Sequence, residues 1–412
     1  MWDWILDRMM RDFVQRGTLS LTFPDGTRRT YGGGEAPQID VTFHDKAIPR
    51  RLVINTDLAV GESYMDGTLT IADDDLEGFL RLATMNAALG DTVWWRALSA
   101  RLFKARRLFD QWNPIHKARA NVAHHYDLSS DLYDLFLDED RQYSCAYFSD
   151  PDLSLDAAQE AKKHHIARKL LLKPGMRVLE IGCGWGGMAL TLARDYDVHV
   201  LGVTLSEEQH RSATQRAEAA GLQDRVTFRL QDYRDVTGQF DRVVSIGMFE
   251  HVGTPHFREY FRNVHDRLTD DGVALIHSIG RAYPPGHTSP WIQKYIFPGG
   301  YCPSLSEMAA AVEKEDLYPT DIEVWRLHYA ETLRHWHDRF TAREAEAEAL
   351  FDARFCRMWR YYLKAAETTF RHNRQCVFQF QMARRQDAVP LTRDYLYADR
   401  DPSRTQDDVA AQ

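Results

Sequence analysis

The sequence predicts an α/β protein whose larger domain is a doubly wound parallel sheet and whose smaller, N-terminal domain is α+β. Two observations carry this prediction. From residue 176 onward, short apolar runs alternate with amphipathic segments of helical length, which is typical of parallel strands joined by crossover helices. The chain also has 412 residues, more than one ordinary domain holds. We therefore expect an N-terminal domain over residues 1–115, a sheet domain over 116–385 and a polar, poorly ordered tail over 386–412.

The N-terminal domain is predicted from one helix and several alternating segments. Residues 2–14 place five apolar side chains on one helical face: Trp2, Ile5, Leu6, Met9 and Phe13. This face either packs on its own domain, as such faces usually do, or lies on a membrane surface. The remaining pattern predicts strands over 18–23, 28–31, 38–43 and 51–54, a loop over 61–67 and a helix over 75–89.

The charge of the chain restricts its partners. A net charge of −9 argues against a general nucleic-acid binder and against nonspecific attraction to anionic membranes. A membrane contact would therefore need a local patch. Residues 91–120 are predicted to be helical and basic, and they form either a solvated linker or a contact with phospholipid headgroups. The cations of this segment are Arg96, Arg101, Lys104, Arg106, Arg107, Lys117 and Arg119.

Cysteine usage and hydropathy predict a cytoplasmic protein. The five cysteines contain no C-x-x-C pair, which argues against a disulfide scaffold or a zinc site. No stretch is long and apolar enough to span a bilayer. The N-terminus carries Asp3 where a signal peptide would carry bases. His124, His125, His164 and His165 do not indicate a metal site, because neighbouring residues on an element point apart.

A glycine-rich loop is the clearest functional signal. The apolar run 176–181 is followed by Gly182, Gly184 and Gly186, and a helix begins at residue 188. This is the layout of a Rossmann-like nucleotide crevice at the carboxyl end of a first strand. Glycine is needed there because the turn is tight and the ligand must meet bare backbone. The glycine spacing alone is a weak signal, but G-x-G-x-G with Glu180 just ahead of it, taken together with the segments further along the chain, favours S-adenosylmethionine over a dinucleotide.

The elements after this loop complete the predicted sheet. Further strands are expected over residues 198–203, 226–230, 241–246, 272–279 and 375–382. Helices are expected over 206–220, 256–268, 327–345 and 348–368, with Ser206 as the N-cap of the first. Residues 282–303 are irregular and aromatic, so they line either an acyl-chain channel or a lid over the cofactor. The aromatic stripe over 351–362 is more typical of a core than of a tunnel.

Seven segments in order carry a family resemblance. They are His125–Leu128, Gln142–Tyr147, Glu180–Gly187, Gly202–Ser206, Gln231–Tyr233, Gly247–Val252 and Trp291–Pro298. Together they resemble the cyclopropane-fatty-acyl-phospholipid synthase family over residues 120–385, and residues 1–115 resemble its N-terminal domain more weakly. The resemblance implies a class I methyltransferase fold and S-adenosylmethionine as cofactor. It also implies membrane phospholipids with unsaturated acyl chains as substrate, met by a peripheral protein at the inner membrane surface.

The cofactor residues follow from the loop and from the resemblance. Glu180 can hold the glycine loop through backbone N–H groups, and the three glycines let the backbone meet the methionine head. The resemblance assigns the ribose to Thr204 and Gln209, where a general nucleotide site would carry an acid. The alternative is that these two are a turn residue and an exposed helix residue. The resemblance also assigns adenine to Asp232 and Tyr233, and it implies that Tyr143 and Ser144 close over the cofactor.

The predicted chemistry requires a base. Methylating an isolated double bond leaves a carbocation, and closing a ring requires removal of a proton from the transferred methyl. In the family that base is bound bicarbonate. The matching positions are Cys145 and Ile279 through backbone N–H groups, His277 and Tyr329 as donors, and Glu250 as acceptor of the bicarbonate proton. Glu250 and His251 could instead be a structural pair, and His277 alone could be a core histidine.

Three functions stay open from the sequence. The first is cyclopropane formation on phospholipid acyl chains. The second is the same first step with a methyl- or methylene-branched product, or methylation of a related small molecule. The third is a lipid-binding module without catalysis, which would be expected to have lost part of the bicarbonate set or the glycine loop. The sequence also leaves a homodimer open.

Overall fold

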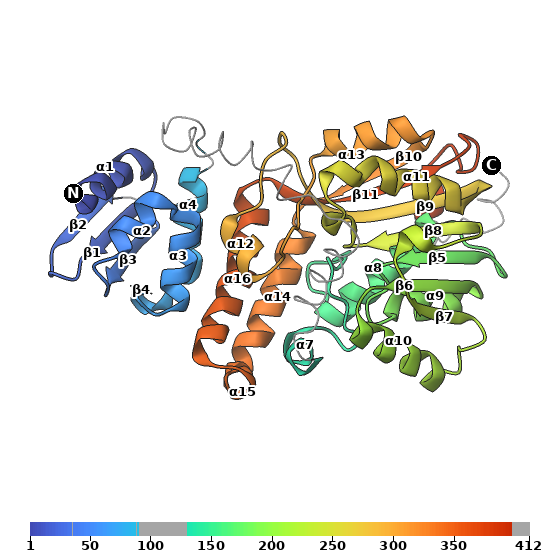
Figure 1. Ribbon diagram of the computed structural model, residues 1–412, viewed down its shortest axis with the longest axis horizontal. Coiled ribbons are helices and arrows are strands. Elements are labelled where there is room, and N and C mark those ends of the chain that lie inside the picture. Colours follow the sequence, from blue (N-terminus) through green and yellow to red (C-terminus); the bar gives the residue numbers. More distant parts are fainter. Residues whose placement is uncertain (35, 88, 90–129, 398–412) are drawn as a thin grey trace. The chain divides into compact units, whose positions relative to one another are not determined.

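The computed structural model describes residues 1–34, 36–87, 89 and 130–397. The predicted basic segment 91–120, with His124 and His125, lies outside these residues. The chain forms two compact units (Figure 1). The first comprises Met1–Asp110, Gly286–Pro298 and Tyr329–Gln375, and the second comprises Gln111–Pro285, Gly299–His328 and Cys376–Gln412. These units interleave along the sequence, and the predicted domain boundaries near residues 115 and 385 stay predictions.

The first unit begins with a small mixed sheet. Helix α1 (Trp2–Phe13) precedes β1 (Thr18–Thr22), β2 (Arg28–Gly32), β3 (Gln38–Phe43) and, later, β4 (Leu69–Ile71). The strand order is β2-β1-β3-β4, with β1 parallel to β3 and the other pairs antiparallel. The strands predicted over 18–23, 28–31 and 38–43 are thus confirmed. Helix α4 (Leu76–Ala87) confirms the predicted helix, and its Asn86 accepts hydrogen bonds from the backbone N–H groups of Gln15 and Arg16, both at 2.9 Å.

Two local predictions in this unit are wrong. Residues 51–54 belong to helix α2 (Ile48–Ile54), and 61–65 belong to helix α3 (Thr56–Met65). The Asn55 side chain caps α3 by accepting the N–H of Leu58 at 3.3 Å. Gly61 lies inside this helix. The position requires glycine because a Cβ there would stand 2.4 Å from the Trp291 ring. The glycine therefore marks close packing with a residue far along the chain, rather than a turn.

Helices from the second half of the chain complete the first unit. They are α12 (Pro290–Tyr295), α14 (His328–Ala342), α15 (Glu344–Leu350) and α16 (Ala353–His372), and α16 packs on α3 and α4. Trp291 Nε1 donates to the Met65 sulfur at 3.2 Å, and Arg357 Nε donates to the Met65 carbonyl at 2.7 Å. Within the predicted aromatic stripe, Trp359 and Tyr362 are buried in this packing.

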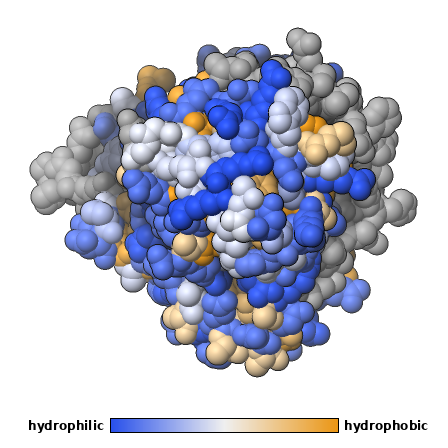
Figure 2. All heavy atoms as spheres, turned by 90° about the vertical axis from the view of Figure 1, so that its left-hand side faces the viewer, coloured by the Kyte–Doolittle hydropathy of each residue, from blue (hydrophilic) through white to orange (hydrophobic). Residues whose placement is uncertain are grey.

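The surface of α1 bears on the two alternatives for its apolar face. Leu6, Met9 and Met10 are buried, so this face packs within its own unit, whereas the Trp4 side chain is 65% exposed. Figure 2 shows separate apolar areas within a largely hydrophilic face of the molecule. In the ranges that the structure describes, no helix combines the length and the apolar character needed to cross a bilayer.

The second unit contains a seven-stranded sheet of order β10-β11-β9-β8-β5-β6-β7 (Figure 1). Its strands are β5 (Arg177–Ile181), β6 (His199–Thr204), β7 (Val226–Leu230), β8 (Phe240–Ile246), β9 (Leu268–Arg281), β10 (Tyr318–Trp325) and β11 (Gln375–Ala383). The run from β9 to β7 is parallel, and β10 pairs antiparallel with β11. This confirms the predicted doubly wound α/β fold, to which the structure adds β10.

Helices cover both faces of this sheet and create two apolar cores. One face carries α11 (Phe257–Arg267) and α13 (Leu305–Val312), and the other carries α8 (Leu155–Lys169), α9 (Gly187–Tyr196) and α10 (Glu207–Ala219). The short helix α7 (Ser130–Phe136) precedes α8. The strand order reverses direction at β5, which has β6 on one side and β8 on the other. A ligand crevice is expected at the carboxyl ends of strands at such a point.

The C-terminal tail departs from its prediction as far as residue 397. Val389 and Leu396 are buried, and Val389 packs with Val273 and Ala383. Arg393 pairs with Asp321 of β10 at 2.5 Å. The segment is mostly polar, so its composition did not indicate that Val389 and Leu396 would be buried. Residues 398–412 lie outside the described chain.

Candidate active site

A cavity of about 150 Å³ lies at the carboxyl ends of β5, β6, β7 and β8. The loops after these strands and the segment 141–144 form its wall. It is lined by nine of the ten residues predicted to bind the cofactor: Tyr143, Ser144, Glu180, Gly182, Gly184, Thr204, Gln209, Asp232 and Tyr233. His251 lines it as well. The structure therefore brings together residues that span 90 positions of the sequence, from 143 to 233.

The three glycines of the loop have different reasons to be glycine. All adopt the left-handed region, with φ of +80° at Gly182, +52° at Gly184 and +83° at Gly186. A Cβ on Gly184 would meet no atom within 4 Å, whereas a Cβ on Gly186 would stand 2.6 Å from the Phe228 ring. Gly184 borders the cavity and leaves its backbone open to a ligand. Gly186 does not line the cavity, and here its backbone and its packing on Phe228 require glycine.

Glu180 lies buried at the cavity wall with one oxygen available. Its carboxyl accepts the backbone N–H of Ala189, in the first turn of α9. Its Oε2 atom has no hydrogen-bond partner among the described residues. Burial raises the pKa of this carboxyl to about 8, against the opposing effect of the nearby Lys162 ammonium. A buried oxygen without a partner fits a ligand that carries a donor or a positive charge, as the methionine head of the cofactor does.

Thr204 and Gln209 form a neutral polar pair at the end of β6. The Thr204 hydroxyl donates to Gln209 Oε1 at 2.8 Å, and both side chains are buried. Ser206 caps α10, as predicted, by accepting the N–H of Gln209 at 3.3 Å. The alternative in which Gln209 is an exposed helix residue is therefore wrong. The pair offers hydroxyl and amide groups of the kind that hydrogen-bond ribose hydroxyls.

Asp232 is buried after β7 and is paired with an arginine that the sequence analysis did not single out. Arg234 donates to both oxygens of this carboxylate, from Nε at 2.8 Å and from Nη2 at 2.7 Å. The Arg234 guanidinium also lies 5.4 Å from the centre of the Tyr233 ring. A carboxylate has about four acceptor positions, so Asp232 can still accept from an adenine amine. The spacing Asp-x-Arg at a strand end was the available signal.

The segment 142–145 rests on two polar side chains of α8 that were also missed. Gln159 and Lys162 donate hydrogen bonds to Gln142 and Ser144. The Cys145 thiol is buried and lies 3.4 Å from the carbonyl oxygen of Ala146, so the thiol faces backbone. The signal for Gln159 and Lys162 was their place on the inward stripe of α8, beside the buried Leu155, Ala158 and Ile166.

Glu250 lies on a 3₁₀ turn, η3 (Phe249–His251), just after β8. Its Oε1 accepts the backbone N–H of Ile279 at 2.6 Å, and its Oε2 has no partner among the described residues. Burial raises the pKa of this carboxyl to about 7. The structure thus joins Glu250 and Ile279 as a pair, with the Ile279 N–H directed to the carboxylate. Its predicted contact with bicarbonate stays a prediction.

His277 lies two residues before Ile279 on β9, so both side chains point to one face of the sheet. Its Nδ1 lies 3.1 Å from the Gln379 amide nitrogen, and its ring stands edge-on to Trp325 at 5.2 Å. Burial lowers the pKa of this imidazole well below its usual range. Because an amide nitrogen can only donate, this contact leaves the proton of the neutral ring on Nε2. The ring then has a donor on Nε2, its predicted hydrogen bond to bicarbonate stays a prediction, and Gln379 is a partner that the sequence did not reveal.

Tyr329 belongs to the first compact unit. It is the second residue of α14, is buried, and lies against the rings of Trp336 and Phe370, with centroids 5.8 and 4.9 Å away. Glu250 and His277 belong to the second unit. The predicted hydrogen bond from Tyr329 to bicarbonate stays a prediction.

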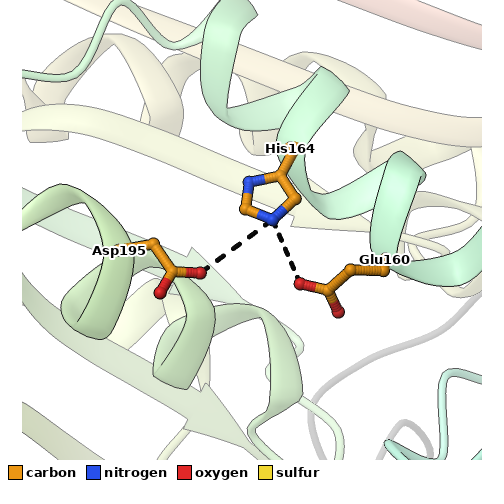
Figure 3. A group of neighbouring side chains, drawn as sticks. All are labelled: Glu160, His164 and Asp195. Carbon is orange, nitrogen blue, oxygen red and sulfur yellow. Dashed lines mark hydrogen bonds and ion pairs between the residues drawn. The ribbon is translucent and has the colours of Figure 1, made fainter. Parts of the chain in front are cut away.

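Glu160, His164 and Asp195 converge between α8 and α9, as Figure 3 shows. His164 Nε2 lies 3.1 Å from Glu160 and 3.9 Å from Asp195. Both carboxylates already have cationic partners, Lys163 at 2.7 Å and Arg194 at 2.6 Å. Ion pairs therefore account for the group, which carries no argument for a metal site. His165 turns elsewhere, to Glu323 at 2.8 Å.

Comparison with known proteins gives matches over most of the chain. A family model described as mycolic acid cyclopropane synthetase matches residues 114–380, and one described as a domain of unknown function matches residues 5–88. The cyclopropane-fatty-acyl-phospholipid synthase of Escherichia coli K12 is 42% identical over 343 residues, covering 82% of this chain and 86% of that protein. A tuberculostearic acid methyltransferase of Mycobacterium tuberculosis is 37% identical over 396 residues, covering 92% and 91%.

A solved structure supports the cofactor. The crystal structure of a mycolic acid cyclopropane synthase complexed with S-adenosylhomocysteine (SAH) and CTAB is 34% identical to this chain. It aligns with a TM-score of 0.62 over 66% of this chain and 99% of that one. With the family match and the cavity at the carboxyl ends of the strands, this similarity supports the predicted S-adenosylmethionine site.

Proposed function

For this chain, which belongs to the mycolic acid cyclopropane synthetase family and is an S-adenosylmethionine-dependent methyltransferase, we propose a lipid substrate. We propose that it methylates the double bond of unsaturated acyl chains in membrane phospholipids and that the product is a cyclopropane ring. The relative from Escherichia coli, whose name states a phospholipid product, supports this substrate. The observation that carries the proposal is Glu250, a buried carboxyl beside β9 with one oxygen held and the other available. A lipid-binding module would not need such a group.

The cofactor would be held by the residues around the cavity. Gly184 leaves backbone open to the methionine head, Glu180 offers an oxygen to its ammonium group, and Thr204 with Gln209 offers neutral partners to the ribose. Bound S-adenosylmethionine would supply a methyl group activated by a sulfonium cation. The substrate supplies the electrons of its double bond, and its acyl chain is left with a positive charge.

The residues at Glu250 suit the proton loss that must follow. Bicarbonate would supply the base for the transferred methyl, and it is an anion that carries one proton. Neutral His277 would donate to it from Nε2, and Glu250 Oε2 would accept its proton. The pKa of Glu250 is raised to about 7 by burial, so this carboxyl can take up and release a proton near neutral pH. Cys145 would contribute its backbone N–H rather than its thiol.

A branched product is the second candidate. The tuberculostearic acid methyltransferase that matches 92% of this chain supports a fatty acid methyltransferase with another fate for the carbocation. Methylation of a related small molecule is the remaining alternative. Both fatty-acid candidates share the cofactor, the first step and the base, so the product must decide between them.

Lipid analysis in a host that lacks such an enzyme tests the proposal. The full chain would be expressed and the extracted phospholipids examined by proton NMR, which separates ring hydrogens from those of branched isomers of equal mass. We expect cyclopropane signals and a matching loss of double-bond signals. Branched signals would favour the second candidate, and unchanged lipids would contradict both.

The proposed substrate requires the protein to reach a bilayer. We propose a peripheral, cytoplasmic protein that works at the inner membrane surface. Sedimentation of purified protein with phospholipid vesicles should show reversible, salt-sensitive binding if charged patches contribute. Analytical ultracentrifugation without lipid decides between a monomer and the homodimer that the sequence leaves open.

A further inference from the structure

The segment that borders the cavity between residues 142 and 145 is held by one face of α8. Gln159 Nε2 donates to the backbone carbonyls of Gln142 and Ser144 at 3.1 and 2.9 Å. Lys162 Nζ, three residues later on the same helix face, donates to the side-chain oxygens of the same two residues, Gln142 Oε1 at 2.6 Å and Ser144 Oγ at 2.8 Å. Gln159 thus fixes the backbone, and Lys162 fixes the side chains.

Lys162 is a lysine with no exposed surface. A buried ammonium is costly unless it is hydrogen-bonded and lies near opposite charge. The charged and titratable groups that face it come from every element packed around it: Asp138 and Asp140 before the segment, Cys145 within it, Lys163 on α8, Glu180 on β5 and His277 on β9. Its direct acceptors are the neutral side chains of Gln142 and Ser144, and the nearby carboxylates Asp138 and Asp140 stabilise its charge.

We propose that Lys162 is a positioning residue for the cofactor, whose charged ammonium holds Gln142 and Ser144 in place and so fixes the stretch Tyr143–Cys145 beside Glu180. This inference rests on the proposed placement of S-adenosylmethionine in the cavity. Tyr143 and Ser144 line that cavity, as does Glu180. Lys162 does not line it, so it acts on the ligand through these residues.

The charge of Lys162 gives a readout that simple packing would not give. Burial lowers the pKa of this ammonium to about 8, against the opposing effect of Asp138. Below that pH the ammonium is charged and its hydrogen bonds are strong, and above it they become bonds from a neutral amine. The advantage of lysine over an uncharged side chain should therefore be present at about pH 6.5 and should fade by about pH 9.5.

Calorimetric titration of the purified full-length protein with SAH measures this advantage. Lys162→Met keeps an unbranched side chain, one atom shorter, and removes its charge. At about pH 6.5 it should bind SAH about 10- to 100-fold more weakly than wild type. At about pH 9.5 the ratio of the two Kd values should fall below about threefold. The amino group of SAH titrates in the same way in the wild-type and Lys162→Met experiments, so its effect cancels in the ratio of their Kd values.

Lys169→Met is the matched control. Lys169 is a second lysine of α8 without exposed surface, and its ammonium pairs with Glu323 at 2.5 Å instead of with the 142–145 segment. This variant should bind SAH within about threefold of wild type at both pH values. An equal loss in both variants would show that any buried lysine of α8 matters only for stability, which would overturn the inference.

The other outcomes are equally decisive. Wild-type affinity in Lys162→Met, or a loss that is the same at both pH values, overturns the positioning role while leaving the cofactor site intact. Absence of SAH binding by wild type would instead remove the cofactor placement itself. Where Lys162→Met does not fold, Ser144→Ala replaces it, because it removes one acceptor of the ammonium. Its affinity loss should also shrink at high pH, and a loss independent of pH would overturn the inference.

Discussion

Replacing Glu250 by glutamine should remove most of the turnover and leave cofactor binding nearly unchanged. The amide oxygen of glutamine can still accept the Ile279 N–H that Oε1 accepts at 2.6 Å. The position of Oε2, which has no partner among the described residues, would then carry an amide donor where an acceptor is needed. The variant should therefore keep the hydrogen bond from Ile279 and lose the acceptance of the bicarbonate proton.

The expected loss is that of one positioned general base, about 10²–10⁴-fold in kcat, or about 3–5 kcal/mol of transition-state stabilisation. Because burial raises the pKa of Glu250 to about 7, wild-type kcat should rise with pH through that value as the carboxyl ionises. The glutamine variant should lack this rise. Its Kd for SAH should stay within about threefold of wild type.

Initial rates of methyl transfer from labelled cofactor to unsaturated phospholipid vesicles measure the effect, with and without dissolved bicarbonate. Wild-type activity should fall when bicarbonate is stripped and return when it is restored, and the variant should respond less. Glu315→Gln is the control, since Glu315 is a buried carboxylate paired with Arg258 and Arg262 on α11. If Glu250→Gln turns over normally and wild type ignores bicarbonate, Glu250 is a structural carboxyl and the proposed base is wrong.

Three further substitutions separate ligand contact from packing. Gly184→Val should weaken SAH binding at least about tenfold, because its φ of +52° disfavours a branched residue and its Cβ would enter the space beside the cavity; unchanged calorimetric affinity would contradict the cofactor placement. Gly186→Ala should instead reduce the free energy of unfolding by about 1–3 kcal/mol, and so lower the Tm, because its Cβ would stand 2.6 Å from Phe228. An unchanged melting curve would refute this. Cys145→Ser should keep substantial activity because the thiol faces the Ala146 carbonyl, and a folded but inactive serine variant would make the thiol part of the chemistry.

Residues that sit at a strand end could be found from the sequence. Gly182, Thr204, Asp232 and Glu250 each follow an apolar run, and parallel strands bring such ends to one edge of the sheet. The local pattern therefore predicted the fold of the second unit and the edge of the sheet at which these residues meet, whereas the family resemblance assigned most of the cofactor residues that line the cavity. Ser206 was predictable for a similar reason, since an N-cap is a local feature.

Residues that act through distant partners could not be found in this way. Gln379 meets His277 from 102 positions away, and Lys162 meets Ser144 from 18 positions away, across two elements. Gly61 was assigned to a loop because Trp291, the residue that requires glycine there, lies 230 positions later. Burial also reassigns Gln209, whose sequence context allows an exposed helix position. Periodicity can place a residue such as Lys162 on the inward face of its helix, but neither propensity nor periodicity says which distant residue it will contact.

The most direct test of the proposed reaction is the fate of the methyl carbon in a purified system. The protein would be incubated with S-adenosylmethionine labelled with carbon-13 in its methyl group and with vesicles of unsaturated or fully saturated phospholipid. Carbon NMR of the extracted lipid should show the label as a ring methylene, in the unsaturated lipid alone. Label in a methyl or exocyclic methylene group would contradict ring closure, and unlabelled lipid from an enzyme that binds SAH would contradict an acyl chain as the substrate.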